Sequence, residues 1–369
     1  PVDVQACRVE EETLKGFTIP SYELKLQESQ LEEIVSLLKS AKRPVIYAGA
    51  GVGMSGAKDE FRVLIEKLNI PVLVHWNGMD VLENDHPLYM GRPGAVGQRA
   101  ANFVLQNSDL LITIGTRLYL LQTGFNFAGY AKNAKHIMVD IDKAELDKPT
   151  LHPYMKVQCD AYEFITALLN RNDLLKLNCE SWIAKGKEWN AKYPSLNPLW
   201  LKDTKYINSY YLLDEISKQM TADDIYVGGR AGTCVDATIK AFNVKRGQGV
   251  YVTKGLSAMG NGLPAAIGGA YATGKKVVCV NGDGGFVMNI QELEVIRRDN
   301  LSVKFFILDN QGYSTVRNTQ TNVFDKHFVG CDATSGLTVG NIKGVAEAYG
   351  IKTFVMKSYD EMSSVIREV

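Results

Sequence analysis

The sequence lacks the features that mark a nucleic-acid-binding, membrane-spanning or disulfide-rich protein. Lysine plus arginine equals aspartate plus glutamate, with 41 of each, so no net charge attracts nucleic acid or an anionic membrane. No apolar run approaches the roughly 20 residues that a membrane-spanning helix needs, and we recognise no secretory signal. The six cysteines are scattered, without a CxxC pair or a metal-binding spacing, which indicates a reduced, cytoplasmic protein.

The composition describes a globular protein with a substantial core. The chain has 369 residues, of which 46% are apolar and 22% charged, enough for two or three domains. Short, nearly continuous apolar runs alternate with helix-period stretches, which is typical of parallel strands covered on both faces. After the run in RPVIYAG, the predicted strands lie in residues 71–76, 109–115, 136–142, 223–229, 275–283, 303–310 and 352–357.

This pattern predicts an α/β protein with two doubly wound, mostly parallel sheets. We expect a Rossmann-like domain over residues 21–170, a linker with one helix over 171–205, and a second domain over 206–369. Ser29 to Glu32 form a possible capping box, and a helix is expected to begin near Ser55, after a glycine turn.

Two polar side chains follow predicted strands of the second domain. Asp283 comes after VVCV, and Asn310 comes after FFIL. Ligands of open α/β sheets bind outside the carboxyl ends of the strands, where these two side chains can meet. Gly282, Gly284 and Gly285 allow the backbone a tight turn and a close approach to a ligand. A helix expected near Asn289 would direct free N–H groups to the same place, which suits a phosphate.

These residues predict a Mg²⁺ site that is completed by a diphosphate. Mg²⁺ prefers oxygen ligands and usually shares them with phosphates. The carboxylate of Asp283, the amide oxygen of Asn310 and the carbonyl of Gly312 would supply three oxygens. Taken alone, each motif is more often a simple turn or a loop start. The two motifs together, with strand–turn–helix–strand organisation around them, are much more specific.

The GDG turn and the downstream asparagine resemble the cofactor-binding motif of the thiamine-diphosphate-dependent enzymes. KGLSAMGNGLPAAIGGA (254–270), RPVIYAGAGV and NDHPLYMGRPG are similar to segments of the acetolactate synthase-like group, and the similarity covers nearly the whole chain. The resemblance implies thiamine diphosphate and Mg²⁺ as cofactors. It makes Asp283, Asn310 and Gly312 the metal ligands.

The same resemblance assigns further cofactor-binding residues. Gly282, Gly284 and Gly285 would lie against the diphosphate, with Tyr313 in the adjoining loop. Met259 matches the apolar wedge that bends the cofactor, although an ordinary core methionine is the alternative reading. Ser257 stands where the family often has glycine, and its carbonyl would accept from the aminopyrimidine.

The resemblance also implies parts that this chain does not contain. Residues 1–20 look like the tail of a first, pyrimidine-binding domain, since PVDVQ is similar to that domain's end. That domain normally carries the catalytic glutamate, so no catalytic residue is assigned here. The chain also ends in a helix, YDEMSSVIREV, before an expected last strand. We therefore expect this chain to be a fragment of an enzyme and to be inactive alone. The whole enzyme would decarboxylate a 2-oxo acid and then either release an aldehyde or join the remaining acyl group to a second carbonyl compound. It would work as a homodimer or homotetramer.

Binding of FAD is doubtful. GAGVGMSG (49–56) resembles a dinucleotide-binding turn, but a close-packed strand–helix turn has the same pattern. Asp140 and Asp142 end a strand, as a ribose-binding acid would or as ordinary polar strand ends do. Acetolactate synthases proper have a run resembling RFDDRVTG, whereas this chain has RLYLLQTG (117–124), which keeps Arg117 but loses both acids.

The remaining polar candidates are weaker. His327, Thr315 and Arg317 lie in the loop after Asn310, where Arg317 would meet a substrate carboxylate or remain solvated. His75 and His86 receive no catalytic role. Two alternatives stay open: a related decarboxylase or C–C lyase/ligase with a substrate other than pyruvate, and a nucleotide- or flavin-binding module without carboligase activity.

Overall fold

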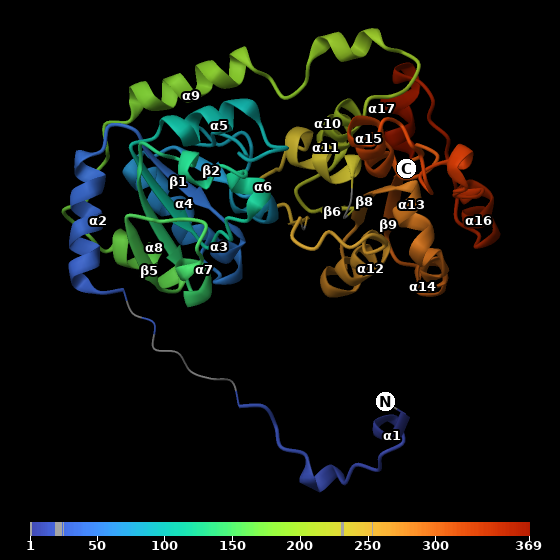
Figure 1. Ribbon diagram of the computed structural model, residues 1–369, viewed down its shortest axis with the longest axis horizontal. Helices are drawn as coiled ribbons and strands as arrows, with labels where there is room; N and C mark the ends of the chain where they lie inside the picture. The colour runs from blue at the N-terminus through green and yellow to red at the C-terminus, as the bar shows by residue number, and fades with distance from the viewer. Residues whose placement is uncertain (1, 19–23, 25, 230–231, 253) are drawn as a thin grey trace.

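Apolar strands form two separate sheets, each built of parallel strands (Figure 1). The computed structural model describes residues 2–18, 24, 26–229, 232–252 and 254–369. The first sheet has the order β2-β1-β3-β4-β5, the second has the order β7-β6-β8-β9, and every pairing in both is parallel. The predicted α/β class with doubly wound, mostly parallel sheets is confirmed.

We call the first sheet with helices α2 to α8 the first unit, and the second sheet with helices α10 to α17 the second unit. The strands of the first sheet are β1 (Pro44–Ala48), β2 (Val72–Val74), β3 (Leu110–Ile114), β4 (Lys135–Asp140) and β5 (Met155–Gln158). Its helices are α2 (Glu28–Ser40), α3 (Ala50–Met54), α4 (Lys58–Leu68), α5 (Arg99–Asn107), α6 (Leu120–Thr123), α7 (Lys143–Asp147) and α8 (Ala161–Leu169).

The second unit repeats the alternation of strand and helix. Its strands are β6 (Ile225–Gly228), β7 (Val250–Tyr251), β8 (Val277–Gly282) and β9 (Val303–Leu308). Its helices are α10 (Ser209–Gln219), α11 (Thr233–Ala241), α12 (Gly262–Thr273), α13 (Asp283–Phe286), α14 (Leu293–Arg298), α15 (Ser314–Val323), α16 (Ile342–Ala348) and α17 (Tyr359–Glu368). The 3-10 helices are η1 (Glu11–Thr13), η2 (Trp76–Val81), η3 (Phe127–Gly129), η4 (Pro198–Lys202), η5 (Val287–Glu292) and η6 (Ala333–Ser335).

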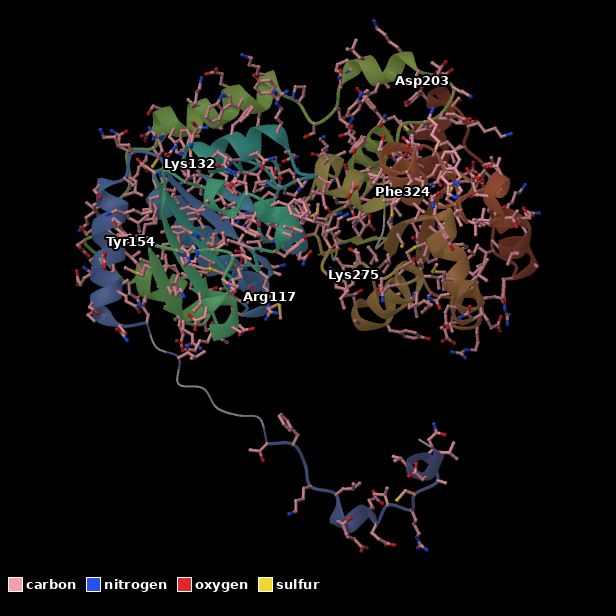
Figure 2. The ribbon with its side chains drawn as sticks, viewed as in Figure 1. Arg117, Lys132, Tyr154, Asp203, Lys275 and Phe324 are labelled. Atoms are coloured by element: carbon pink, nitrogen blue, oxygen red, sulfur yellow. The ribbon has the colours of Figure 1, made fainter. Side chains whose placement is uncertain are left out.

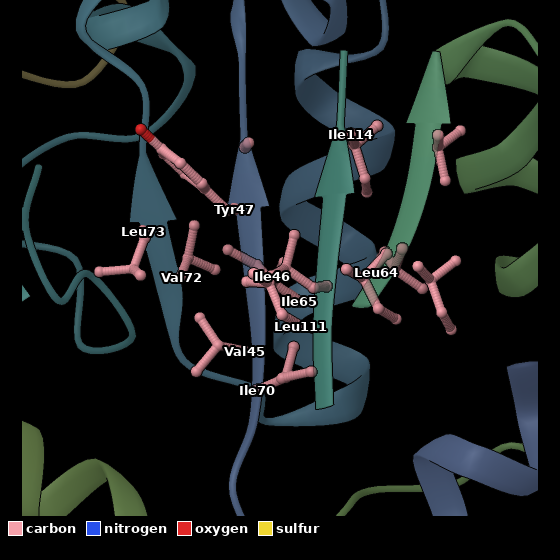
Figure 3. Packing of buried hydrophobic residues seen from close by; sticks show 14 of the residues in the cluster. Val45, Ile46, Tyr47, Leu64, Ile65, Ile70, Val72, Leu73, Leu111 and Ile114 are labelled. Atoms are coloured by element: carbon pink, nitrogen blue, oxygen red, sulfur yellow. The ribbon is translucent and has the colours of Figure 1, made fainter. Parts of the chain in front are cut away.

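The core of the first unit forms because its central strands are apolar on both faces. Every residue of β1 and of β3 is buried. Figure 3 shows Val45 and Ile46 of β1 among side chains from the neighbouring strands and from α4, including Leu64 and Ile65. The helix α4 is amphipathic, and its apolar face is fully buried against this sheet.

The two units pack against each other through η2 and the loop that follows it. Trp76 and Met79 of η2 belong to the same buried cluster as Leu213 of α10 and Phe242. Arg92 has no exposed surface and donates from Nε to the Ile239 carbonyl at 2.6 Å and from Nη2 to the Phe242 carbonyl at 2.7 Å. It therefore binds the carboxyl end of α11 from the first unit.

Two segments, helix α9 and residues 2–18, belong to neither unit as defined above. Helix α9 (Glu180–Lys192) runs along the first unit before the chain passes to the second (Figure 1). Residues 2–18 are exposed, and their side chains pack against neither unit (Figure 2). None of the described helices is long and apolar enough to cross a membrane. The six cysteines all lie in the described part of the chain, and none of them is in a disulfide.

Several local predictions were wrong at helix ends. The capping box at the start of α2 is formed by Gln27 and Gln30, because Ser29 already lies within the helix. The helix expected near Ser55 begins at Ala50, directly after the glycine turn, and breaks before α4. The helical stretch expected near Asn289 begins at Asp283, and Asn289 is a kink with φ −130°.

Val2–Gln5 form a short helix, α1, while Pro1 lies outside the described residues. The strand predicted near the other end of the chain was wrong. Residues 352–357 form no strand, because their backbone makes no ladder with the edge strand β9. The edge strands β5 and β7 were not predicted. The first alternates polar with apolar residues, and the second is two residues long.

Candidate functional site

The second sheet brings the predicted site residues to one edge. Strands β8 and β9 are parallel and adjacent, with Gly282 opposite Leu308, so both open at the same edge. Asp283 is the first residue of α13, and Asn310 lies two residues beyond the end of β9. The chain passes from β6 to β7 on one side and then crosses to β8 on the other, so the strand order reverses between β6 and β8. Ligands of open α/β sheets bind at such a point.

The Asp283 carboxylate joins the two loops. Its side chain is 1% exposed. Oδ1 accepts a hydrogen bond from the Gly284 N–H at 2.7 Å, and Oδ2 accepts one from the Gly312 N–H at 2.9 Å. Burial raises the pKa of the Asp283 carboxyl, while the N–H donors of Gly312 and Gly284 act in the opposite direction. The structure therefore holds a buried acid that is hydrogen-bonded both to the GDG turn and to the loop of Gly312.

Asn310 presents an oxygen without a partner. Its Oδ1 is buried and makes no hydrogen bond, whereas its backbone carbonyl accepts from Arg317 Nη2 at 3.4 Å. A buried acceptor without a donor is costly unless a ligand or ion satisfies it. A carboxylate and an amide oxygen are the kinds of donor that a hard cation binds, so the donor chemistry of Asp283 and Asn310 fits a magnesium ion.

The backbone at Gly312 admits no side chain. Its φ is +136°, and a Cβ there would lie 2.3 Å from the Cys331 carbonyl oxygen. Tyr313 donates its N–H to the same carbonyl at 2.8 Å, and Gly312 pairs with Asp332 in an isolated bridge. The segment of Cys331 and Asp332 therefore holds the loop of Gly312 in place beside the GDG turn.

The glycines of the GDG turn differ in their surroundings. A Cβ at Gly284 would lie 2.3 Å from Tyr313 Cε1, so the tyrosine ring fills that space. A Cβ at Gly285 would lie 3.0 Å from Asn281 Oδ1. By contrast, no atom lies within 4 Å of a Cβ built on Gly282. Packing within the chain thus requires the absence of a side chain at Gly284, and Gly282 borders open space.

The segment with Ser257 and Met259 is held from two sides. Lys254 donates its N–H to Asn77 Oδ1 of the first unit at 3.2 Å, and its Nζ pairs with Asp236 of α11 at 2.6 Å. Ser257 has φ +50°, a left-handed conformation that favours glycine, and its Oγ is buried without a partner. Met259 is 39% exposed, so its side chain is available to a ligand.

The weaker candidates do not converge on the site in the same way. His327 is exposed. Arg317 pairs with Asp332 at 3.6 Å in addition to its contact with the Asn310 carbonyl, so it supports the loop. Thr315 lies beside Gly232, at the start of α11. His75 is buried, which lowers its pKa to about 3.

Two asparagines at this edge were missed by the sequence reasoning. Asn281 Nδ2 and Asn261 Oδ1 are buried and make no hydrogen bond. The available signal was Asn281 itself, a polar residue at the end of the apolar run VVCVNG. Among the described residues, no three His, Cys, Asp or Glu side chains lie together as a metal site. A cation bound by Asp283 would therefore need amide or backbone oxygens in addition to that carboxylate.

The glycine turn of the first unit is explained by packing. A Cβ at Gly49 would lie 2.1 Å from the Gly115 carbonyl oxygen, and one at Gly51 would lie 2.7 Å from Gly115 Cα. The carboxyl ends of β1 and β3 thus approach each other through these glycines. The turn would need glycine here even without a dinucleotide.

The polar residues at this edge of the first sheet are engaged within the fold. Asp140 Oδ1 accepts from the Asp142 N–H, and Asp142 Oδ1 accepts from the Ala144 N–H, both at 2.9 Å. Arg117, labelled in Figure 2, donates to Asp142 Oδ2 at 3.1 Å. These two acids therefore bind backbone N–H groups, and Asp142 also binds Arg117, within the fold.

Comparison with known proteins agrees with this geometry. Two family models match the chain: "Thiamine pyrophosphate enzyme, central domain" over residues 31–168 and "Thiamine pyrophosphate enzyme, C-terminal TPP binding domain" over residues 230–369. The "Probable acetolactate synthase large subunit" of Methanococcus aeolicus is 33% identical over 92% of this chain and 58% of its own length. The "Acetolactate synthase isozyme 1 large subunit" of Escherichia coli K12 is 29% identical over 100% of this chain and 64% of its own.

A plant relative is also similar to this chain over part of its own length. "Acetolactate synthase 1, chloroplastic" of Zea mays is 32% identical over 80% of this chain and 47% of its own length. The chain thus spans less than two thirds of the length of these curated relatives.

Proposed function

The chain belongs to the thiamine pyrophosphate enzymes, and from this premise we propose that the carboxyl edge of its second sheet binds thiamine diphosphate with Mg²⁺. We propose further that the whole protein is an acetolactate synthase-like enzyme that decarboxylates a 2-oxo acid. The substrate proposal rests on relatives whose names describe acetolactate synthases. Cytoplasmic location stays a prediction.

One observation carries the proposal. The unpaired Oδ1 of Asn310 lies in the loop that the Asp283 carboxylate holds through the Gly312 N–H. Both side chains are at the carboxyl ends of adjacent parallel strands. Asp283, Asn310 and the Gly312 carbonyl would hold the magnesium ion, and the diphosphate would supply further oxygens.

Each residue has a defined task in this proposal. When bound, thiamine diphosphate supplies a nucleophilic carbon and an electron sink. Asp283 and Asn310 anchor the charged end of the cofactor through the metal. Met259 presents apolar bulk to its middle, and the left-handed backbone at Ser257 directs a carbonyl toward its pyrimidine end. The residues in this chain therefore bind and orient, and the proton-transferring glutamate is not assigned to any of them.

The central region acts without flavin in our proposal. We propose the division into a structural Rossmann-like domain over residues 21–170, a linker over 171–205 and a cofactor-binding domain over 206–369. The internal contacts of Gly49, Gly51 and Asp142 support a packing role for the first unit. We further propose a homodimer or homotetramer.

Turnover by the full-length protein tests the proposal. The protein is supplied with thiamine diphosphate, Mg²⁺ and pyruvate, with and without FAD, and CO₂ and acetolactate are measured. We expect release of CO₂ and formation of acetolactate that do not depend on FAD. Acetolactate formed only with FAD would overturn the flavin-free assignment. If the protein turns over other 2-oxo acids but not pyruvate, the proposed substrate is wrong and the proposed cofactor site is unaffected.

A further inference from the structure

Asn281 lies where the strand order of the second sheet reverses. It is the penultimate residue of β8, and the pairing of Gly228 with Val280 places Gly229 beside it at the end of β6. Open α/β sheets bind ligands outside the carboxyl ends of their strands, at such a reversal of strand order. Asp283 and Asn310 flank the other side of β8, between β8 and β9.

The Asn281 amide has a fixed orientation and an unused donor. The residue is 3% exposed. Its Oδ1 accepts the Gly282 N–H at 3.0 Å, which determines which atom of the amide is the oxygen. The two N–H groups of Nδ2 are buried and find no acceptor. A buried donor without a partner costs on the order of 1–3 kcal/mol, unless a ligand satisfies it.

Three glycines make room for this amide. A Cβ would lie 2.6 Å from Asn281 Oδ1 at Gly229, 2.7 Å from Nδ2 at Gly262, and 3.0 Å from Oδ1 at Gly285. These glycines come from the end of β6, the start of α12 and the GDG helical turn. A polar side chain is thus inserted where three segments of the candidate site meet.

We propose that Asn281 is a further cofactor-binding residue, whose Nδ2 donates a hydrogen bond to an oxygen of the diphosphate at the carboxyl ends of β6 and β8. This inference rests on the proposed function. The diphosphate is the acceptor-rich part of the cofactor, and a neutral amide donor can bind it without a second cation. Asn281 thereby complements the metal ligands from the opposite side of β8.

The chain offers a matched control on the same strand. Cys279 lies two residues before Asn281, so it points to the same face of the sheet, and its Sγ donates to the Gly262 carbonyl at 3.6 Å. The variant Cys279→Ala disturbs the packing of this face and leaves the Asn281 amide in place. The variant Asn281→Asp keeps the acceptor for the Gly282 N–H, removes the donor and adds a negative charge. Asn281→Ala removes both the acceptor and the donor without adding charge, so it is the decisive variant.

The test is calorimetric titration of the full-length protein with thiamine diphosphate and, separately, with inorganic pyrophosphate at fixed Mg²⁺. We expect both Asn281 variants to raise the Kd for both ligands by about tenfold or more, as for loss of a hydrogen bond to a charged group. Cys279→Ala should stay within about twofold of the unaltered protein. Circular dichroism verifies the fold of each variant, and Asn281→Ala decides the question if Asn281→Asp does not fold.

The outcomes separate this inference from the function on which it rests. If the unaltered protein binds both ligands and folded Asn281 variants bind them equally well, Asn281 does not contact the diphosphate and the inference is overturned alone. If the unaltered protein binds neither ligand, the proposed function fails, and the inference fails with it.

Discussion

The ring of Tyr313 fills the space beside Gly284, where a Cβ would lie 2.3 Å from the Tyr313 Cε1 atom. We predict that Gly284→Ala lowers the free energy of unfolding by about 1–3 kcal/mol, because it overpacks this contact. Gly282→Ala is the matched control for stability, since no atom lies within 4 Å of its Cβ position and its φ is −83°. Urea unfolding of both variants measures the difference. Equal stability of the two would show that Tyr313 does not restrict residue 284.

A double variant sharpens this test. Tyr313→Ala removes the ring, so Gly284→Ala in that background should cost less than it does alone. A double-mutant cycle measures this coupling. Additive effects of the two substitutions would contradict the contact.

The left-handed backbone at Ser257 predicts a stabilising substitution. Its φ of +50° disfavours any side chain, and its buried Oγ has no partner. Ser257→Gly should raise the stability of the cofactor-free protein by about 1 kcal/mol. Ser257→Ala removes the hydroxyl but keeps the Cβ, so it separates the two contributions. A destabilised Ser257→Gly in thermal unfolding would indicate that the serine is not strained.

Arg92 predicts how strongly the two units depend on each other. Besides the Ile239 and Phe242 carbonyls it binds Asn84 Oδ1 at 3.2 Å. Arg92→Met should destabilise the protein by about 3 kcal/mol or more, because it leaves buried carbonyls without a donor.

A variant with fewer contacts serves as the comparison for Arg92. Gln98 donates from Nε2 to the Lys240 carbonyl at 3.1 Å, at the same end of α11, and its Oε1 accepts the Arg92 N–H at 2.9 Å. Gln98→Ala removes these two hydrogen bonds of a neutral side chain and should cost about 2 kcal/mol. Denaturant unfolding measures both variants, and an equal, small loss for the two would refute the role of Arg92.

Two buried histidines predict a loss of stability in mild acid. Burial lowers the pKa of His75 to about 3 and that of His136 to about 4, whereas an exposed histidine titrates near 6.5. Between these values the unfolded chain binds protons that the folded chain does not. The free energy of unfolding is therefore unaffected by these two histidines above about pH 6.5. It decreases as the pH falls below that value, by on the order of 2 kcal/mol for each histidine at pH 5.

Substitution of both histidines tests the sign. The variant with His75→Gln and His136→Gln should lose less stability between pH 7 and pH 5 than the unaltered protein. His152→Gln is the control, because that side chain is exposed. An unchanged pH dependence in the double variant would exclude the buried histidines as its cause.

The parts of the fold that could be predicted are those determined by local pattern. The central strands β1, β3, β6 and β8 are short apolar runs because helices cover both faces of each sheet. The edge strands β5 and β7 have weaker patterns, since only part of their surface is buried. Residues 352–357 show the reverse case, because an apolar run becomes a strand only where a partner strand pairs with it.

The candidate site was predictable where chemistry and strand ends coincide. Asp283 and Asn310 stand out as polar residues directly after apolar runs. The roles of Asn281 and Arg92 depend on burial and on partners far along the chain, such as Phe242, 150 residues away. In the sequence, Arg92 in a Gly-Arg-Pro-Gly run is indistinguishable from an exposed loop arginine.

Mg²⁺-dependent binding of thiamine diphosphate is the measurement that tests the central claim most directly. The full-length protein is titrated with the cofactor in Mg²⁺ and in EDTA, as the unaltered protein and as Asp283→Ala and Asp309→Ala. Asp309 is exposed in the same loop as Asn310, so its variant controls for loss of a nearby carboxylate. We predict tight binding that needs Mg²⁺, is lost in Asp283→Ala and is retained in Asp309→Ala. Undiminished binding by Asp283→Ala, or binding that ignores EDTA, would contradict the account.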